Sequence, residues 1–143
     1  MAILTKDEIV ALVIQMVPPA DQALMLGLIE HESSFKPYAF AMDSNGGSVG
    51  LTQMDVPTAR DNGFAGSWFT LFDEATSIFY GYAQIGWLRS YKGGKFTPDQ
   101  VIAGYNEGAG NVMKGIKDQP YVAAVSAARD RWKAVLDQKA GKA

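Results

Sequence analysis

The sequence predicts a mainly α protein of the α+β type, folded as a single helical domain over residues 1–143 with one long glycine-containing loop. Helix-start signals recur along the chain, apolar residues follow them at helical spacing, and residues 33–53 show no period. A chain of 143 residues suits one compact core, which needs no disulfides or metal at this size. We therefore expect a helical domain interrupted by one loop.

Two helices are expected before the loop. Thr5 and Glu8 form a capping box, which opens a helix that continues to about residue 17. Pro18 ends this helix, because proline disfavours helical geometry in the residue before it. Pro19 can occupy the first turn of a second helix, which continues to about Glu32.

The loop over residues 33–53 contains Pro37, Gly46, Gly47 and Gly50 and has no helical or strand period. Loops of this length inside a compact domain are uncommon and are typically functional. We expect this loop, or a short hairpin within it, to form part of a site.

Further helices are expected after the loop, each opened by a capping residue or a proline. In the longest of them, Ile78, Phe79 and Tyr82 are predicted to face inward. These helices are a short one from Asp55 to about residue 62, a long one over residues 73–91, one that begins at Thr97 and is interrupted at residues 108–110, and a last one opened by Pro120.

The composition excludes several kinds of chemistry. The chain has 13 Lys and Arg against 15 Asp and Glu, one His and no Cys, which gives a net charge of -2. Without Cys, a disulfide, an iron–sulfur cluster and a thiol nucleophile are impossible, and we expect neither cofactor nor metal. Nucleic acid is not expected as a partner, because its phosphates require clustered positive charge. No apolar stretch reaches the ~20 residues of a membrane span, so no membrane insertion is expected.

Glu32 is the residue that the sequence marks out for catalysis. At the C-terminal end of a helix, partial burial and the negative end of the helix dipole both raise the pKa of its carboxyl group. A glutamate held protonated near neutral pH can act as a general acid. Without further context, a solvated helix-end glutamate would be the commoner explanation.

Three short motifs supply that context. Glu-Ser-Ser-Phe-Lys-Pro stands at residues 32–37, Gly-Ser-Val-Gly-Leu-Thr-Gln at 47–53 and Gly-Tyr-Asn-Glu-Gly-Ala-Gly-Asn-Val at 104–112. In this order, over residues 20–132, the chain resembles the superfamily of soluble lytic transglycosylases and goose-type lysozymes, which cut the glycan strands of peptidoglycan. The resemblance implies a lysozyme-like fold with its active-site cleft at the loop, and glycan strands as the partner.

The resemblance implies roles for five residues. Glu32 corresponds to the acid that protonates the oxygen between N-acetylmuramic acid and N-acetylglucosamine. Ser33 corresponds to a serine that helps to hold the sugar, and Gln53 to a glutamine that lines the cleft opposite the acid. Tyr105 and Asn106 correspond to a pair whose tyrosine hydroxyl steadies the catalytic carboxylate. Ordinary alternatives are a helix C-cap for Ser33, a turn hydrogen bond for Gln53 and a core position for Tyr105.

Two positions depart from the family pattern. Thr52 replaces the usual methionine, which removes apolar surface expected to face the sugar. Glu107 replaces a small residue and adds a carboxylate close to the expected cleft, where it either contacts substrate or stays solvated. Of these two alternatives, a solvated Glu107 is the commoner.

Asp43 and Asp55 bear on the reaction. Acids before and just after the glycine loop resemble the goose-type pattern, in which a second carboxylate positions water. This favours a muramidase that hydrolyses the β-1,4 bond with Glu32 as the acid. A turn at Asp43 and a helix cap at Asp55 would explain the same residues structurally. The alternatives are a lytic transglycosylase that uses Glu32 alone and yields 1,6-anhydromuramic products, and a non-catalytic wall-binding or virion module.

The charge and the N-terminus predict how such an enzyme reaches the wall. Residues 9–17 are apolar but lack the flanks of a signal peptide. A net charge of -2 gives no long-range attraction to anionic wall polymers. We therefore expect a monomeric bacteriophage enzyme, either an endolysin released from the host cytoplasm to the periplasm and cell wall or a virion-associated enzyme.

Overall fold

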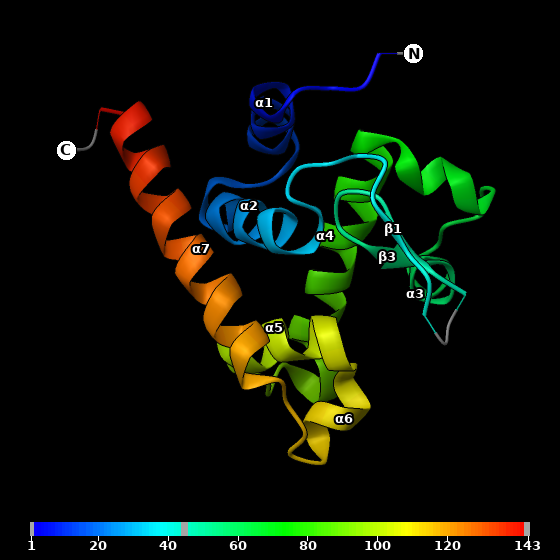
Figure 1. Cartoon of the computed structure of the whole chain (residues 1–143). Coiled ribbons are helices and arrows are strands. Elements are labelled where there is room, and N and C mark those ends of the chain that lie inside the picture. The colour runs from blue at the N-terminus through cyan, green and yellow to red at the C-terminus, as the bar shows by residue number, and fades with distance from the viewer. Residues whose placement is uncertain (1, 44–45, 142–143) are drawn as a thin grey trace.

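Helices make up most of the protein, and a small sheet lies at one side of them (Figure 1). The computed structural model describes residues 2–43 and 46–141. The mainly α prediction is confirmed, and no helix within this described part is long and apolar enough to cross a membrane. The helices are α1 (Lys6–Met16), α2 (Pro19–Ser33), α3 (Val56–Asp61), α4 (Glu74–Ser90), α5 (Pro98–Glu107), α6 (Ala109–Met113) and α7 (Gln119–Lys139); the 3-10 turns are η1 (Trp68–Phe72) and η2 (Tyr91–Gly93), and the strands are β1 (Phe40–Ala41), β2 (Ser48–Val49) and β3 (Met54–Asp55).

The helix starts follow the predicted capping signals. The Thr5 hydroxyl accepts a hydrogen bond from the Glu8 N–H, and the Glu8 carboxylate accepts one from the Thr5 N–H. Thr97 and Gln100 form the same reciprocal pair at the start of α5. Each pair satisfies backbone donors that the first helical turn leaves without partners, so the boundary is set locally.

The predicted loop contains the hairpin, and a third strand follows directly after the loop. The sheet is antiparallel in the order β1-β2-β3, with Val49 opposite both Phe40 and Met54. Between β2 and β3 the chain turns at Gly50, whose φ of +77 favours glycine; an added Cβ would lie 2.4 Å from the Leu71 carbonyl oxygen. The turn therefore brings β3 back beside β2. Strands of two residues have no detectable period, which is why β3 was not predicted.

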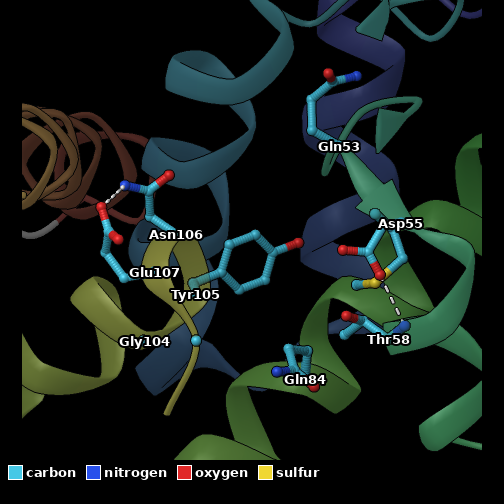
Figure 2. A pocket seen from close by; sticks show the side chains of 10 residues that line it. Gln53, Asp55, Thr58, Gln84, Gly104, Tyr105, Asn106 and Glu107 are labelled. Atoms are coloured by element: carbon cyan, nitrogen blue, oxygen red, sulfur yellow. Dashed lines mark hydrogen bonds between the residues drawn. The ribbon is translucent and has the colours of Figure 1, made fainter. Parts of the chain in front are cut away.

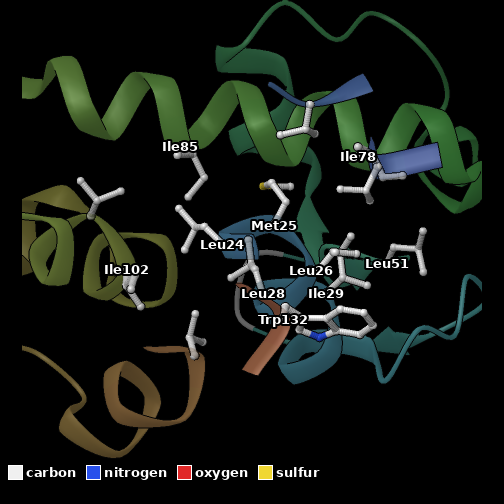
Figure 3. Close-up of a cluster of buried hydrophobic side chains, with 14 of the residues drawn as sticks. Leu24, Met25, Leu26, Leu28, Ile29, Leu51, Ile78, Ile85, Ile102 and Trp132 are labelled. Carbon is white, nitrogen blue, oxygen red and sulfur yellow. The ribbon is translucent and has the colours of Figure 1, made fainter. Parts of the chain in front are cut away.

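The core lies around α2, which is buried on nearly all sides from Leu24 to Ile29. Helix α7 packs closely on α2 at Gly27, where an added Cβ would lie 2.7 Å from the backbone nitrogen of Arg129. Figure 3 shows side chains of α2, α4, α5 and α7 meeting in this core: Leu24, Met25, Leu26, Leu28, Ile29, Ile78, Ile85, Ile102 and Trp132. A buried helix thus carries Glu32 at its C-terminal end.

The predicted inward face of α4 is partly wrong. Ile78 is buried as expected, but Phe79 is 57% exposed. The buried face instead includes Ser77 and Gly81, two small residues. They allow the loop residue Thr52 to pack directly against the helix, where an added Cβ at Gly81 would lie 2.6 Å from its Cγ2. Ser77 and Gly81 therefore share the buried face of α4 with Ile78, Ile85 and Leu88, and Phe79 lies outside this face.

Candidate active site

Glu32 lies in the last turn of α2 and is held there by the way the helix ends. Ser34 adopts left-handed geometry with φ 52, and its N–H donates to the Glu30 carbonyl at 3.0 Å. The next residue, Phe35, is buried and packs on Trp132 of α7, with ring centroids 5.6 Å apart. The chain therefore leaves α2 anchored to the core.

Tyr121, in the first turn of α7, contacts Glu32 directly. Its hydroxyl donates to Glu32 Oε2 at 2.5 Å, and its ring packs nearly perpendicular to the His31 ring, with 4.9 Å between the centroids. Asp118 caps α7 by accepting the Tyr121 N–H at 3.1 Å. Tyr121 was not predicted as a site residue. The sequence indicated only that Tyr121 lies in the first turn of a helix, because Pro120 marks the start of that helix.

Burial raises the pKa of the Glu32 carboxyl above its ordinary value of 4.5, and the hydrogen bond from Tyr121 opposes part of this rise. The predicted direction is confirmed. Burial also raises the pKa of the Tyr121 hydroxyl far above 10, and the neighbouring Glu32 charge adds to this rise. Tyr121 therefore stays a neutral hydrogen-bond donor, and Glu32 holds its proton to a higher pH than a solvated glutamate does.

Tyr105 occupies a different place from the predicted one. Its hydroxyl donates to the Thr52 carbonyl at 2.8 Å, so it bonds to the loop, and Tyr121 is the tyrosine that bonds to Glu32. Burial raises the pKa of Tyr105, and the negative charges of Glu32 and Asp55 raise it further. Tyr105 thus lies within electrostatic reach of both carboxylates.

A pocket of about 200 Å³ opens beside Tyr105 (Figure 2). The loop contributes Gln53 and Asp55, and the end of α5 contributes Tyr105, Asn106 and Glu107. Four predicted site residues therefore meet at one cavity, together with Glu107, the residue that differs from the family pattern. Glu32 is not among the lining residues; its charge acts on Tyr105, which does line the pocket. Over the described ranges 2–43 and 46–141, no group of three His, Asp or Glu side chains could hold a metal ion.

Two of the predicted sugar-binding residues, Gln53 and Ser33, already donate hydrogen bonds to backbone carbonyls of the protein. Gln53 lines the pocket and also makes a turn bond, since its Nε2 donates to the carbonyls of Ala39 and Gly50 at 3.1 and 3.0 Å. Ser33 is 7% exposed, and its hydroxyl donates back to the Ile29 carbonyl at 3.1 Å. The C-cap of α2 is Ser34, so the alternative explanation of Ser33 as the cap is wrong.

Asp43 and Asp55 both accept hydrogen bonds that stabilise local structure, Asp43 within the loop and Asp55 at the start of α3. Asp43 accepts the Gly47 N–H at 3.1 Å and the Ser48 hydroxyl at 2.7 Å, which ties the β1–β2 hairpin together. Asp55 Oδ1 accepts the Thr58 N–H at 2.7 Å and caps α3. The turn at Asp43 and the cap at Asp55 are therefore confirmed, and Asp55 additionally faces the pocket.

Thr52 does not face the pocket, so its predicted effect on the sugar-facing surface is wrong. The side chain is fully buried, and its hydroxyl donates to the Ser77 carbonyl at 2.9 Å. Its backbone N–H also donates to the Ser77 hydroxyl at 3.1 Å. A threonine here joins the loop to α4, which a methionine side chain cannot do by hydrogen bonding.

Tyr121→Phe is expected to raise the pKa of Glu32 above the wild-type value, because it removes the hydrogen bond that lowers this pKa. The measurement is a ¹³C NMR titration of the Glu32 carboxyl carbon. Tyr105→Phe is the matched control, since it removes a hydroxyl that bonds to Thr52, and a smaller shift is expected. An unchanged Glu32 pKa in Tyr121→Phe would contradict the role given to this contact.

Comparison with known proteins identifies the family of this chain and a solved structure of similar fold. Residues 15–124 match the family model of the transglycosylase SLT domain. The X-ray structure of an inactive mutant of the lytic transglycosylase Slt from Pseudomonas aeruginosa is similar in fold, with a TM-score of 0.65 and 18% identity. That match covers 92% of this chain and 24% of the other, so this chain spans about a quarter of that protein's length. Because the family model covers most of the sequence, the chain belongs to the transglycosylase SLT domain family.

Proposed function

We propose that this domain cleaves the β-1,4 bond between N-acetylmuramic acid and N-acetylglucosamine in peptidoglycan, with Glu32 as the general acid. The observation that carries the proposal is the environment of Glu32: a carboxyl group whose pKa burial raises, held by Tyr121 at 2.5 Å. Its charge also acts on Tyr105, which lines a pocket of about 200 Å³ at the loop. Membership of the transglycosylase SLT domain family supports the same substrate.

The contact with Tyr121 distinguishes the two carboxyl oxygens of Glu32. Oε2 accepts the Tyr121 hydroxyl, whereas Oε1 accepts no hydrogen bond from the part of the chain that the structure describes. Oε1 is therefore the oxygen that carries the proton to the glycosidic oxygen. As the proton transfers, the bond from that oxygen to the muramic C1 breaks, and the aglycone leaves as an alcohol.

For the second half of the reaction we propose transglycosylation. The N-acetyl carbonyl of the muramic residue stabilises the positive charge at C1. The C6 hydroxyl of the same residue then attacks C1 and returns its proton to the Glu32 carboxylate. The product is a 1,6-anhydro ring, and no water is consumed. The bonds that Asp43 makes within the hairpin and that Asp55 makes to the start of α3 support this choice, because they account for both acids without a second catalytic carboxylate.

Hydrolysis is the second candidate, and one observation favours it. Asp55 lines the pocket, and only its Oδ1 is engaged in the helix cap. Its other oxygen, Oδ2, can accept a hydrogen bond from a water molecule. In this reaction a water oriented by Asp55 replaces the C6 hydroxyl as the nucleophile, and the product has a reducing end.

Mass spectrometry of the muropeptides released from purified sacculi distinguishes the two reactions. Transglycosylation is expected to yield 1,6-anhydromuramic ends, lighter by one water than the hydrolysis products. Asp55→Asn is expected to give the same products, and asparagine can still cap α3. Reducing-end products that the wild type releases and Asp55→Asn does not would establish hydrolysis and contradict the proposed transglycosylation.

A further inference from the structure

The pocket beside Tyr105 is negatively charged. Asp55 and Glu107 are its acidic lining residues, and among the described residues that line it there is no Lys, Arg or His. Figure 2 shows these two carboxylates on either side of the Tyr105 ring. Peptidoglycan itself carries carboxylates, and a negatively charged pocket repels them. The same pocket attracts positively charged substituents of the strand.

Each of these two carboxylates has one oxygen that accepts a hydrogen bond from a protein group. Asp55 Oδ1 accepts the Thr58 N–H, and Glu107 Oε1 accepts a long bond of 3.4 Å from the Asn106 amide. Asp55 Oδ2 and Glu107 Oε2 accept none from the residues that the structure describes. The pocket therefore offers charged acceptors to a ligand. A primary ammonium group matches them, because it carries one positive charge and three donors and has no acceptor.

The position of Glu107 strengthens this attraction. It is the last residue of α5, where the negative end of the helix dipole adds to its own charge. Its side chain is partly buried at the pocket wall, which weakens screening by solvent and salt. A cation at the pocket therefore meets the field of the helix end as well as the two carboxylates.

We infer that this pocket selects peptidoglycan strands that present a primary ammonium group, with Glu107 as the specificity-determining residue; the inference rests on the proposed function. Two parts of the polymer can supply the group: the free 2-amino group of a de-N-acetylated glucosamine, and the free side-chain amine of a diamino acid in the stem peptide. The muramic N-acetyl group stays in place in either case, because the proposed reaction uses it.

The experiment compares KM on two pairs of substrates at low salt. Peptide-free glycan strands, with and without enzymatic de-N-acetylation of glucosamine, test the sugar amine. Intact sacculi, with and without acetylation by acetic anhydride, test the stem-peptide amine. We expect the wild type to show a KM about fivefold lower on the amine-bearing member of at least one pair, a preference that salt reduces. The pair that shows the preference identifies the source of the amine.

Variants of α5 connect the preference to Glu107. Glu107→Gln is expected to bring the KM ratio close to one, and Glu107→Lys to favour the acetylated member. Asp99→Asn is the matched control: it removes one negative charge from the exposed first turn of the same helix, and the wild-type ratio is expected.

Each other outcome overturns a defined claim. Equal KM values on both members of both pairs, or a preference that survives in Glu107→Gln, contradict the ammonium inference while leaving the proposed cleavage intact. A wild-type protein that releases no muropeptides from any of the four substrates contradicts the proposed function and this inference with it.

Discussion

Glu32→Gln is expected to release muropeptides from peptidoglycan at least about a hundredfold more slowly than the wild type. Glutamine has nearly the size of glutamate, and its amide oxygen can still accept the Tyr121 hydroxyl. It has no carboxylic proton for the glycosidic oxygen, and it cannot take a proton from an attacking hydroxyl. The initial rate of muropeptide release, at equal protein concentration, measures the effect.

A stability measurement on the same variant shows whether the fold is intact. Because burial raises the pKa of Glu32 above 4.5, the folded protein binds this proton more tightly than the unfolded chain does. The free energy of unfolding therefore falls as the pH rises from about 4.5 through the folded pKa. Glutamine has no such proton, so Glu32→Gln is expected to melt near the wild type at pH 4 and above it at pH 8.

Glu30→Gln is the matched control on the same helix. The hydrogen bond from Arg131 lowers the pKa of Glu30, so its charge stabilises the fold above its unfolded pKa, and this stabilisation is lost as the pH falls. Glu30→Gln is therefore expected to melt below the wild type at pH 8 and to keep its activity. Wild-type activity in Glu32→Gln would overturn the assignment of the general acid.

Gly27→Ala is expected to lower the free energy of unfolding by about 1–3 kcal/mol, because it overpacks the core. The new Cβ would lie 2.7 Å from the Arg129 nitrogen and 3.1 Å from its Cα, and backbone atoms cannot move aside as a side-chain end can. Helices α2 and α7 must then separate. Since α2 carries Glu32 and α7 carries Tyr121, activity is expected to fall as well. Urea denaturation and muropeptide release measure the two effects.

Gly86→Ala is the control for the change of glycine to alanine in a helix. Gly86 lies on the exposed face of α4, and an added Cβ there has nothing within 4 Å. The substitution is expected to raise the free energy of unfolding by about 0.5–1 kcal/mol, the ordinary gain in helix propensity. If Gly27→Ala had the same stabilising effect, the close packing of α2 on α7 would be contradicted.

Much of the fold could be predicted, because the helix boundaries depend on short-range chemistry. The capping boxes at Thr5 and Thr97, the cap at Asp55 and the prolines at helix starts each act within one turn of the chain. A single sequence displays such signals completely. The apolar period predicted the buried face of α4 less well, because Phe79 is exposed and the small residue Gly81 is buried.

The candidate site could be predicted only in part. The motifs identified Gln53 and Tyr105, and the placement of acids around the glycine loop identified Asp55; all three line one pocket. Neither pattern identified Tyr121, which hydrogen-bonds to Glu32 from 89 residues along the chain. No local pattern reports a contact over that separation, since it depends on how α7 crosses α2.

The sequence by itself determined where the helices begin and end, which chemistries the composition excludes, the family, and Glu32 as the candidate acid. The tertiary structure decided which tyrosine bonds to which partner: Tyr121 to Glu32, and Tyr105 to the Thr52 carbonyl. It also decided that Thr52 faces the core. The physical reason is the range of the interactions. Caps and turns are short-range effects, whereas desolvation of a carboxylate and the approach of two helices depend on side chains that only the folded chain brings together.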